Sequence, residues 1–169
     1  MIENGFVLAS EVAFDLIRSV YDSTDAFAAD FEQEYPSLAG LSGHLDEIQK
    51  RPGSLFLVAR DENELLGYLF IVPRLAAKLR HTADLHMGVR EEAQGRGVGR
   101  KLLSVALSRL QNERIIEIVY LMVRADNRPA IRLYKMQGFE ELATLARDTK
   151  IGAHYYDGIL MRMRISSDV

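Results

Sequence analysis

The chain has 169 residues, of which 48% are hydrophobic and 27% are charged, and its formal net charge is −3. These values are typical of one globular domain with a single buried core, and they give no basic excess for nucleic acid or a membrane surface. With no cysteine and only four histidines, the sequence excludes a disulfide scaffold, a zinc–thiolate site and a cysteine nucleophile. The histidines lack the spacing H-E-x-x-H, so we expect no metal.

The sequence shows no signal for export or membrane insertion. Its N-terminus lacks the basic start and apolar run of a signal peptide. No apolar stretch reaches the ~18 residues of a membrane span. A cytoplasmic protein is therefore the expectation.

The first 53 residues are expected to form helices after a short edge strand at residues 6–9. Ser10 is a plausible N-cap for the first helix. The apolar face of that helix would carry Val12, Ala13, Leu16, Ile17 and Val20. Residues 22–43 mix acidic and aromatic side chains, which favours a solvated helix face over an acidic wall that attracts a cationic amine. A second helix is predicted at residues 41–50, stopped by Pro52 and Gly53.

Residues 54–61 and 64–73 are predicted to form a β-hairpin, because a short polar link joins two apolar runs. Gly67 is a candidate bulge in the second strand. The basic segment at residues 74–81 is predicted to be a loop.

Residues 84–101 form the most informative stretch, D-L-H-M-G-V-R-E-E-A-Q-G-R-G-V-G-R-K. Its first part alternates like a strand, and its last part begins a helix that reaches about residue 112. Glycines occupy every second position from Gly95 to Gly99. A bare backbone at a helix N-terminus can approach and hold a phosphate.

Two common nucleotide-binding loops do not fit this turn. The dinucleotide fingerprint G-x-G-x-x-G needs glycine where Arg100 stands, and an acidic residue about 20 positions on, where Val119 and Tyr120 lie. The P-loop needs Ser or Thr after the lysine, but Leu102 follows Lys101. The turn is therefore either a phosphate cradle of another class or a glycine turn with only a structural role.

The last third of the chain continues the α/β order. Residues 115–123 are almost continuously apolar, which predicts a buried strand parallel to the central strand at residues 83–89. Asn127 is expected to cap a helix that has Pro129 in its first turn and ends at Gly138. Final strands are predicted at residues 139–145 and 155–165.

Two motifs in this order resemble the Gcn5-related N-acetyltransferase (GNAT) superfamily. The turn carries Gln94-x-x-Gly97-x-Gly99, similar to the family's Q/R-x-x-G-x-G/A pattern. Residues 123–139 match V-x-x-x-N-x-x-A-I-x-L-Y-x-x-x-G-F at every fixed position. Residues 81–89 resemble bacterial members that act on free amino acids and other small amines, and residues 157–161 resemble the family's last strand.

The resemblance implies an α/β fold with one N-acetyltransferase domain over residues 1–169. Its mixed central sheet would have about six to seven strands, splayed at the acetyl-CoA site and flanked by about four helices. Residues 1–53 would supply acceptor-side helices, and residues 54–169 the acetyl-CoA-binding core. Homodimers are common in the family, so a homodimer stays open.

The resemblance also implies the site residues. Acetyl-CoA, the co-substrate, would contact Met87, Val89, Gln94, Gly95, Arg96, Gly97, Val98, Gly99, Arg100, Asn127 and Tyr134. Tyr134 matches the family's general acid, which would protonate the departing thiolate. A backbone N–H near Met87 would stabilise the tetrahedral oxyanion.

A general base is missing from the positions where family members often carry one. Ala83, Leu85 and Met122 occupy those positions here. Asp84 and His86 alternate onto the opposite strand face, and we interpret His86 as structural. The polar candidates left on the acceptor side are Glu32, Glu34, His154 and Tyr155.

Without a strong base, the amine itself becomes decisive. At pH 7 an α-amine with a pKa of about 7.7–8.0 is roughly one-tenth neutral, whereas a lysine-like amine is neutral about once in 2,500. The sequence therefore favours acetylation of a small-molecule amine by direct attack in a ternary complex, with water-relayed deprotonation. An N-terminal peptide acetyltransferase and a non-catalytic acyl-CoA-binding module stay open as alternatives.

Overall fold

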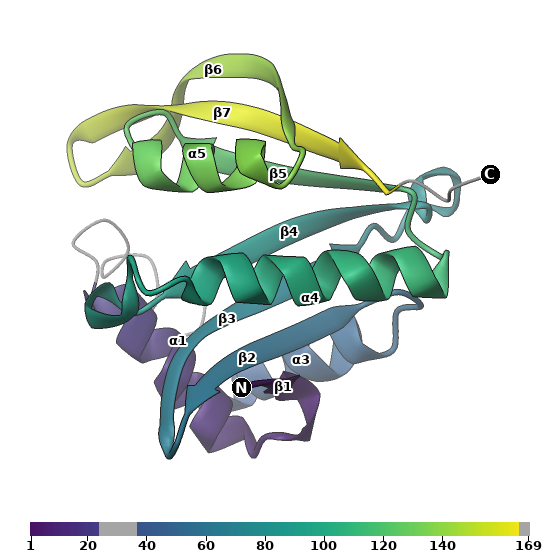
Figure 1. Ribbon diagram of the computed structural model, residues 1–169, viewed down its shortest axis with the longest axis vertical. Helices are drawn as coiled ribbons and strands as arrows, with labels where there is room; N and C mark the ends of the chain where they lie inside the picture. Colours follow the sequence, from purple (N-terminus) through teal and green to yellow (C-terminus); the bar gives the residue numbers. More distant parts are fainter. Residues whose placement is uncertain (24–36, 166–169) are drawn as a thin grey trace.

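One mixed sheet organises the computed structural model, which describes residues 1–23 and 37–165 (Figure 1). Its strands are β1 (Ile2–Asn4), β2 (Leu55–Asp61), β3 (Glu64–Pro73), β4 (Thr82–Val89), β5 (Ile118–Arg124), β6 (Glu140–Ile151) and β7 (His154–Arg164). Their order in the 7-stranded sheet is β1-β2-β3-β4-β5-β7-β6, with β4 and β5 parallel and the other neighbours antiparallel. The expected α/β fold with a mixed central sheet is confirmed.

Helices lie on both faces of the sheet. They are α1 (Ser10–Ser23), α3 (Leu38–Gln49), α4 (Val98–Glu113) and α5 (Arg128–Met136), with 3₁₀ turns at Gly5–Val7, Ala77–Leu79 and Glu91–Ala93. Figure 1 shows α4 and α5 in front of the sheet and α1 and α3 behind it. No helix in the described ranges is both long and apolar enough to cross a membrane.

The apolar periodicity of the sequence explains this arrangement. The α4 helix buries one apolar face, made by Leu102, Leu103, Ala106 and Leu110. These side chains share a core with the strands behind the helix. On the opposite face, α1 and α3 bury their apolar stripes against a second cluster, in which the rings of Phe56 and Phe70 stack at 4.3 Å. Each face of β2 and β3 thus contributes to a separate core.

The sheet opens in its middle. Strand β4 pairs with β5 only through Thr82↔Ile118, Ala83↔Val119 and Asp84↔Tyr120. Beyond these pairs β4 stays with β3 as far as Val89, whereas β5 follows β7 as far as Arg124. The strands therefore splay, as expected, and their facing backbone groups are left for another partner.

Several boundaries differ from the sequence-based expectation. The edge strand lies at Ile2–Asn4, not at residues 6–9, because Asn4 accepts a hydrogen bond from the backbone N–H of Phe6 (3.1 Å) and starts a 3₁₀ turn. Val12 is 41% exposed, although the rest of the predicted stripe of α1 is buried. Helix α3 begins earlier than predicted, capped by Ser37, and β5 begins later.

The C-terminal hairpin is longer than predicted. Strand β6 continues to Ile151 because pairing with β7 resumes at Thr149↔Tyr156 after an irregular stretch. In the first hairpin, the register shift between β2 and β3 lies beside Gly67, in agreement with the expected bulge. Residues 24–36 of the segment 22–43 lie outside the described residues. The expected solvated helix face with acidic and aromatic side chains therefore stays a prediction.

Candidate active site

The glycine turn sits at the N-terminus of α4, beside the opening of the sheet. Gly95 (φ +73°) and Gly97 (φ +81°) both adopt the left-handed conformation, and a Cβ on either would meet nothing within 4 Å. The first intrahelical bond runs from Lys101 N–H to Gly97 C=O (3.0 Å). The N–H groups of the first turn therefore have no carbonyl partner inside the helix, as an anion site requires.

Gly99 brings three elements together. A Cβ at this position would lie 3.2 Å from Cδ2 of Leu133 and 3.4 Å from Cε of Met87. The start of α4 thus touches the end of β4 and the α5 helix. Close approach here places the turn, the splayed strand and the helix that carries Tyr134 around one gap.

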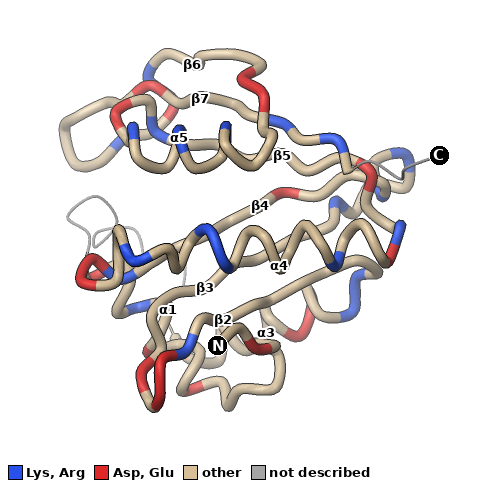
Figure 2. Tube along the Cα trace, in the orientation of Figure 1, with Lys and Arg blue, Asp and Glu red and all other residues tan. Residues whose placement is uncertain are grey.

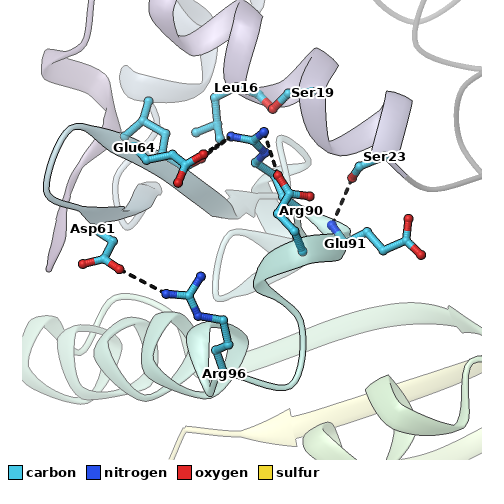
Figure 3. A network of polar contacts seen from close by, with 10 residues as sticks. Leu16, Ser19, Ser23, Asp61, Glu64, Arg90, Glu91 and Arg96 are labelled. Carbon is cyan, nitrogen blue, oxygen red and sulfur yellow. Dashed lines mark hydrogen bonds and ion pairs between the residues drawn. The ribbon is translucent and has the colours of Figure 1, made fainter.

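Side chains of the turn are held in defined positions. Gln94 donates from Nε2 to the carbonyl of Val89 (3.2 Å), which ties the turn to the end of β4. Arg96 donates to Asp61 of the first hairpin (3.1 Å), and both side chains are more than half exposed (Figure 3). Arg100 is exposed in the first turn of α4.

Arg90 anchors the segment between β4 and the turn (Figure 3). Its guanidinium pairs with Glu64 (3.2 Å) and Glu92 (2.6 Å). The next backbone N–H, that of Glu91, donates to Oγ of Ser23 at the end of α1 (3.2 Å). The turn is therefore fixed both to the first hairpin and to the helix on the other face of the sheet.

The charges around the turn have opposite signs on its two sides. Figure 2 shows the acidic 3₁₀ turn Glu91–Ala93 before the glycines and basic residues at the start of α4. Glu92 is paired with Arg90, whereas Arg100 and Lys101 are exposed in the first turn of α4. The net field at the N-terminus of α4 therefore suits an anion.

Tyr134 is a buried phenol on α5, with 6% of its surface exposed. Its ring lies 5.7 Å from that of Phe139, and burial raises its pKa to about 12. Asn127 caps the same helix as expected, accepting from the N–H of Ala130 (3.2 Å). At neutral pH Tyr134 is thus fully protonated, which suits a proton donor rather than a base.

The two faces of β4 carry different chemistry, as strand alternation predicts. Ala83 and Leu85 are buried in the core under α4. Asp84 points to the other face, where Arg74 donates to both of its carboxylate oxygens (2.6 and 3.0 Å). Arg74 also lies over the ring of Tyr120, at 4.6 Å. Asp84 is therefore part of a clamp across the last paired residues of β4 and β5.

The remaining candidate bases are spread out. His154 and Tyr155 are exposed at the start of β7, where the Tyr155 ring lies under Arg147 at 3.9 Å. Glu32 and Glu34 lie outside the described residues. Among the described residues, no group of His, Asp or Glu side chains is arranged to hold a metal ion.

Sequence reasoning did not identify Asp148 of β6. Its carboxylate lies directly over Gly158 of β7, so that a Cβ on Gly158 would be 2.6 Å from Oδ2 of Asp148 and 2.8 Å from Sδ of Met122. Met122 is one of the positions without a base, and its side chain is 43% exposed. The signal in the sequence is weak: an aspartate in a long final hairpin with a glycine ten positions later.

Comparisons with known proteins agree with this geometry. Residues 18–139 match the model of the Acetyltransferase (GNAT) family. An L-amino acid N-acetyltransferase of Escherichia coli K12 is 26% identical over 150 residues, covering 88% of this chain and 90% of the relative. An N-alpha-acetyltransferase of Sulfurisphaera tokodaii is 32% identical over 123 residues, covering 67% of this chain and 66% of the relative.

A solved structure has the same fold. The phosphinothricin acetyltransferase of Sinorhizobium meliloti in complex with acetyl-CoA superposes with a TM-score of 0.80 at 18% identity, covering 97% of this chain and 87% of that one. The family model spans most of the chain, including the glycine turn and Tyr134. The chain therefore belongs to the GNAT family of acetyltransferases.

Proposed function

We propose that the protein transfers an acetyl group from acetyl-CoA to the primary amine of a small molecule, by direct attack within a ternary complex. One observation carries this proposal: the glycine turn lies next to the point where β4 and β5 splay apart and next to the helix that buries the phenol of Tyr134. A relative aligned over 90% of its length is an L-amino acid N-acetyltransferase, and a structural neighbour acts on phosphinothricin. Both acceptors are small molecules.

The pyrophosphate of acetyl-CoA would bind at the N-terminus of α4. The N–H groups of residues 95–100 supply donors, and the positive φ of Gly95 and Gly97 keeps side chains out of the way. Arg100 would add charge. Arg96 would have to leave Asp61, and an exposed ion pair of this kind is worth only about 0–1 kcal/mol.

The pantetheine arm would lie between β4 and β5. Its amide groups suit the backbone groups of Met87 and the N–H of Val89, which have no partner strand on the β5 side beyond Asp84, while the Val89 carbonyl accepts from Gln94. Asn127 uses Oδ1 for the helix cap, so a contact with acetyl-CoA would use its Nδ2 donor.

The chemistry needs an oxyanion donor and an acid. A backbone N–H near Met87 would stabilise the oxyanion, where removing such a donor costs about 2.7–4 kcal/mol in known enzymes. Tyr134 would protonate the thiolate as the C–S bond breaks. Its raised pKa of about 12 keeps the proton on the phenol at neutral pH. Transfer to a thiolate, whose thiol has a pKa of about 8.5, is uphill, so the phenol has to regain a proton from the attacking nitrogen in the same step.

The acceptor would enter from the face of the sheet that carries α1 and α3. Residues 1–53 would form its wall, and residues 54–169 would bind acetyl-CoA. The side chains at Ala83, Leu85 and Met122 are apolar and cannot accept a proton. The amine would therefore lose its proton by another route, for example to water. Weakly basic α-amines would then be the better substrates.

A peptide N-terminus is the second candidate acceptor, favoured by the relative named an N-alpha-acetyltransferase. Met122 opposes it, since N-terminal acetyltransferases that act on ribosomal proteins carry glutamate at this position. A non-catalytic acyl-CoA-binding module is the third candidate function. The buried Tyr134 opposes it, because binding alone does not need a general acid.

Thiol release from acetyl-CoA tests the proposal. The amine panel should contain amino acids, polyamines, aminoglycosides and N-terminal peptides, with Tyr134→Phe measured alongside. Turnover with a small amine, lost in Tyr134→Phe, is the expected result. Tight acetyl-CoA binding without turnover of any amine would instead support the binding module, and selective turnover of peptides would support the second candidate.

A further inference from the structure

Asp148 brings a carboxylate to a part of the site where the strands provide none. Its Oδ2 and the Sδ of Met122 both lie within contact distance of the point where a Cβ on Gly158 would stand (2.6 and 2.8 Å). Met122 lies on β5 beyond Tyr120, the last residue of that strand to pair with β4. The carboxylate of Asp148 therefore lies over β7, next to the side chain of Met122 in the strand that borders the gap. It is on the face opposite α4, because the alternate residues Leu121 and Val123 belong to the core under that helix.

The backbone of the hairpin is shaped to put it there. Pairing between β6 and β7 shifts register between Leu145 and Thr149, which places Asp148 in the irregular stretch. Within it, Arg147 has a φ of +56°, an unfavourable conformation for a side chain of this size. The N–H of Arg147 donates to Asp157 (2.9 Å), which holds the distortion in place.

Gly158 provides the space. Any larger residue would collide with the carboxylate, whose Oδ2 and Cγ would lie 2.6 and 2.8 Å from its Cβ. A strained backbone and a bare strand position thus combine to hold one acidic side chain close to the sheet. Such local strain is commonly found at functional sites.

The surroundings leave this carboxylate available. The hydroxyl of Thr149 donates to Oδ2 (3.3 Å), and no Lys or Arg in the described residues forms an ion pair with Asp148. The nearby cations on β6, Arg147 and Lys150, both lie over the ring of Tyr155. On β5, Arg124 pairs with Asp126 and stacks on Tyr156 at 3.9 Å. The other ionisable groups on β7 near this stretch are His154 and Asp157.

We propose that Asp148 binds the amino group of the acceptor and takes the proton that the nitrogen must lose before it attacks. This inference rests on the proposed acetyl transfer and supplies its missing proton acceptor. It replaces deprotonation by water alone. It also makes a cationic primary amine the preferred acceptor, because the carboxylate attracts the ammonium form.

The ammonium gives one proton to the carboxylate of Asp148, and the neutral nitrogen forms the C–N bond with the acetyl carbon. The C–S bond breaks, and the thiolate takes the proton of Tyr134, which is restored by the second proton leaving the nitrogen. One proton, carried by Asp148, is finally released to water. Transfer to a carboxylate is uphill by the pKa difference, which is smaller for an α-amine than for a lysine-type amine.

The pH dependence of Asp148→Asn tests this role. With the best amine of the panel, kcat/KM should fall at least tenfold at pH 7. The loss should shrink as the pH approaches the pKa of the amine, because solvent then supplies the neutral form. Asp148→Glu should recover part of the activity at pH 7. Acetyl-CoA affinity should be unchanged in both variants.

Two further variants guard against a purely structural effect. Gly158→Ala keeps Asp148 but displaces its carboxylate, so it should show the same pH-dependent loss. Glu141→Gln, an exposed change on the same strand, should behave like the wild type. An equal loss at every pH in Asp148→Asn, or no loss, would overturn the inference while leaving the proposed function intact. Absence of turnover by the wild-type protein would instead overturn the proposed function.

Discussion

Arg74 and Asp84 form a two-point clamp at the place where the sheet begins to open. Arg74 directly follows β3. It donates to both carboxylate oxygens of Asp84 in β4, at 2.6 and 3.0 Å. The same guanidinium lies over Tyr120 of β5, the partner of Asp84 in the last parallel pair. One side chain thus joins three strands immediately before β4 and β5 separate.

Loss of this clamp should lower the stability of the fold. We expect Arg74→Ala to lower the free energy of unfolding by about 1–2 kcal/mol, since a charge-assisted hydrogen bond contributes about 1.5–3 kcal/mol and the pair is about one-third exposed. Urea titration followed by fluorescence measures the change. Arg18→Ala, which removes the exposed i,i+4 pair with Asp22, is the control and should have little effect. Equal effects of both variants would contradict the clamp.

Tyr134→Phe should remove activity without removing affinity. We expect kcat to fall about 10²-fold or more, the usual range for losing a general acid, with little change in the KM for acetyl-CoA. Thiol release under saturating acetyl-CoA measures kcat. A variant that keeps wild-type kcat would show that the thiolate leaves unprotonated or takes its proton from elsewhere.

Tyr134 should also make the fold sensitive to alkaline pH. Burial raises its pKa to about 12, so the folded state keeps the proton where the unfolded chain, with an ordinary phenol pKa near 10, has lost it. The resulting stability is fully present below pH ~10 and is lost as the pH rises towards 12, by up to about 3 kcal/mol. Chemical unfolding at pH 8 to 11 should therefore show a steeper decline for the wild type than for Tyr134→Phe. Parallel curves would indicate that the phenol is not held in its neutral form.

The site residues that were predictable from sequence are those fixed by local backbone rules. The glycines of the turn and the cap at Asn127 depend on conformations set within a few residues. The position of Asp148 depends instead on where β6 loses and resumes its pairing with β7, a relationship that alternation within one strand does not contain. In the same way, the edge strand at Ile2–Asn4 exists because it pairs with residues 57–59, far along the chain.

Gly97→Ala should impair acetyl-CoA binding by straining the turn. A residue with a side chain is disfavoured at φ +81° by about 1 kcal/mol, and relief of that strain would turn the N–H groups away from the anion. Isothermal titration with acetyl-CoA should show at least tenfold weaker binding. Gly152→Ala is a matched control, because Gly152 also has a positive φ (+59°) and open space but lies in the β6–β7 turn. Similar losses in both variants would mean that general destabilisation, rather than the cradle, is responsible.

Replacing Asp61 or Arg96, the two partners of one ion pair, should change the affinity for acetyl-CoA in opposite directions. If Arg96 must leave Asp61 to reach the pyrophosphate, Asp61→Ala removes that competition and should strengthen acetyl-CoA binding about two- to fivefold, consistent with the 0–1 kcal/mol of an exposed pair. Arg96→Ala removes the charge itself and should weaken binding. Both effects should diminish in 0.5 M NaCl, because the two side chains are more than half exposed and screened by salt. Weaker binding in both variants would show instead that the Asp61–Arg96 pair positions the turn, so that acetyl-CoA binds to the arrangement seen here without breaking it.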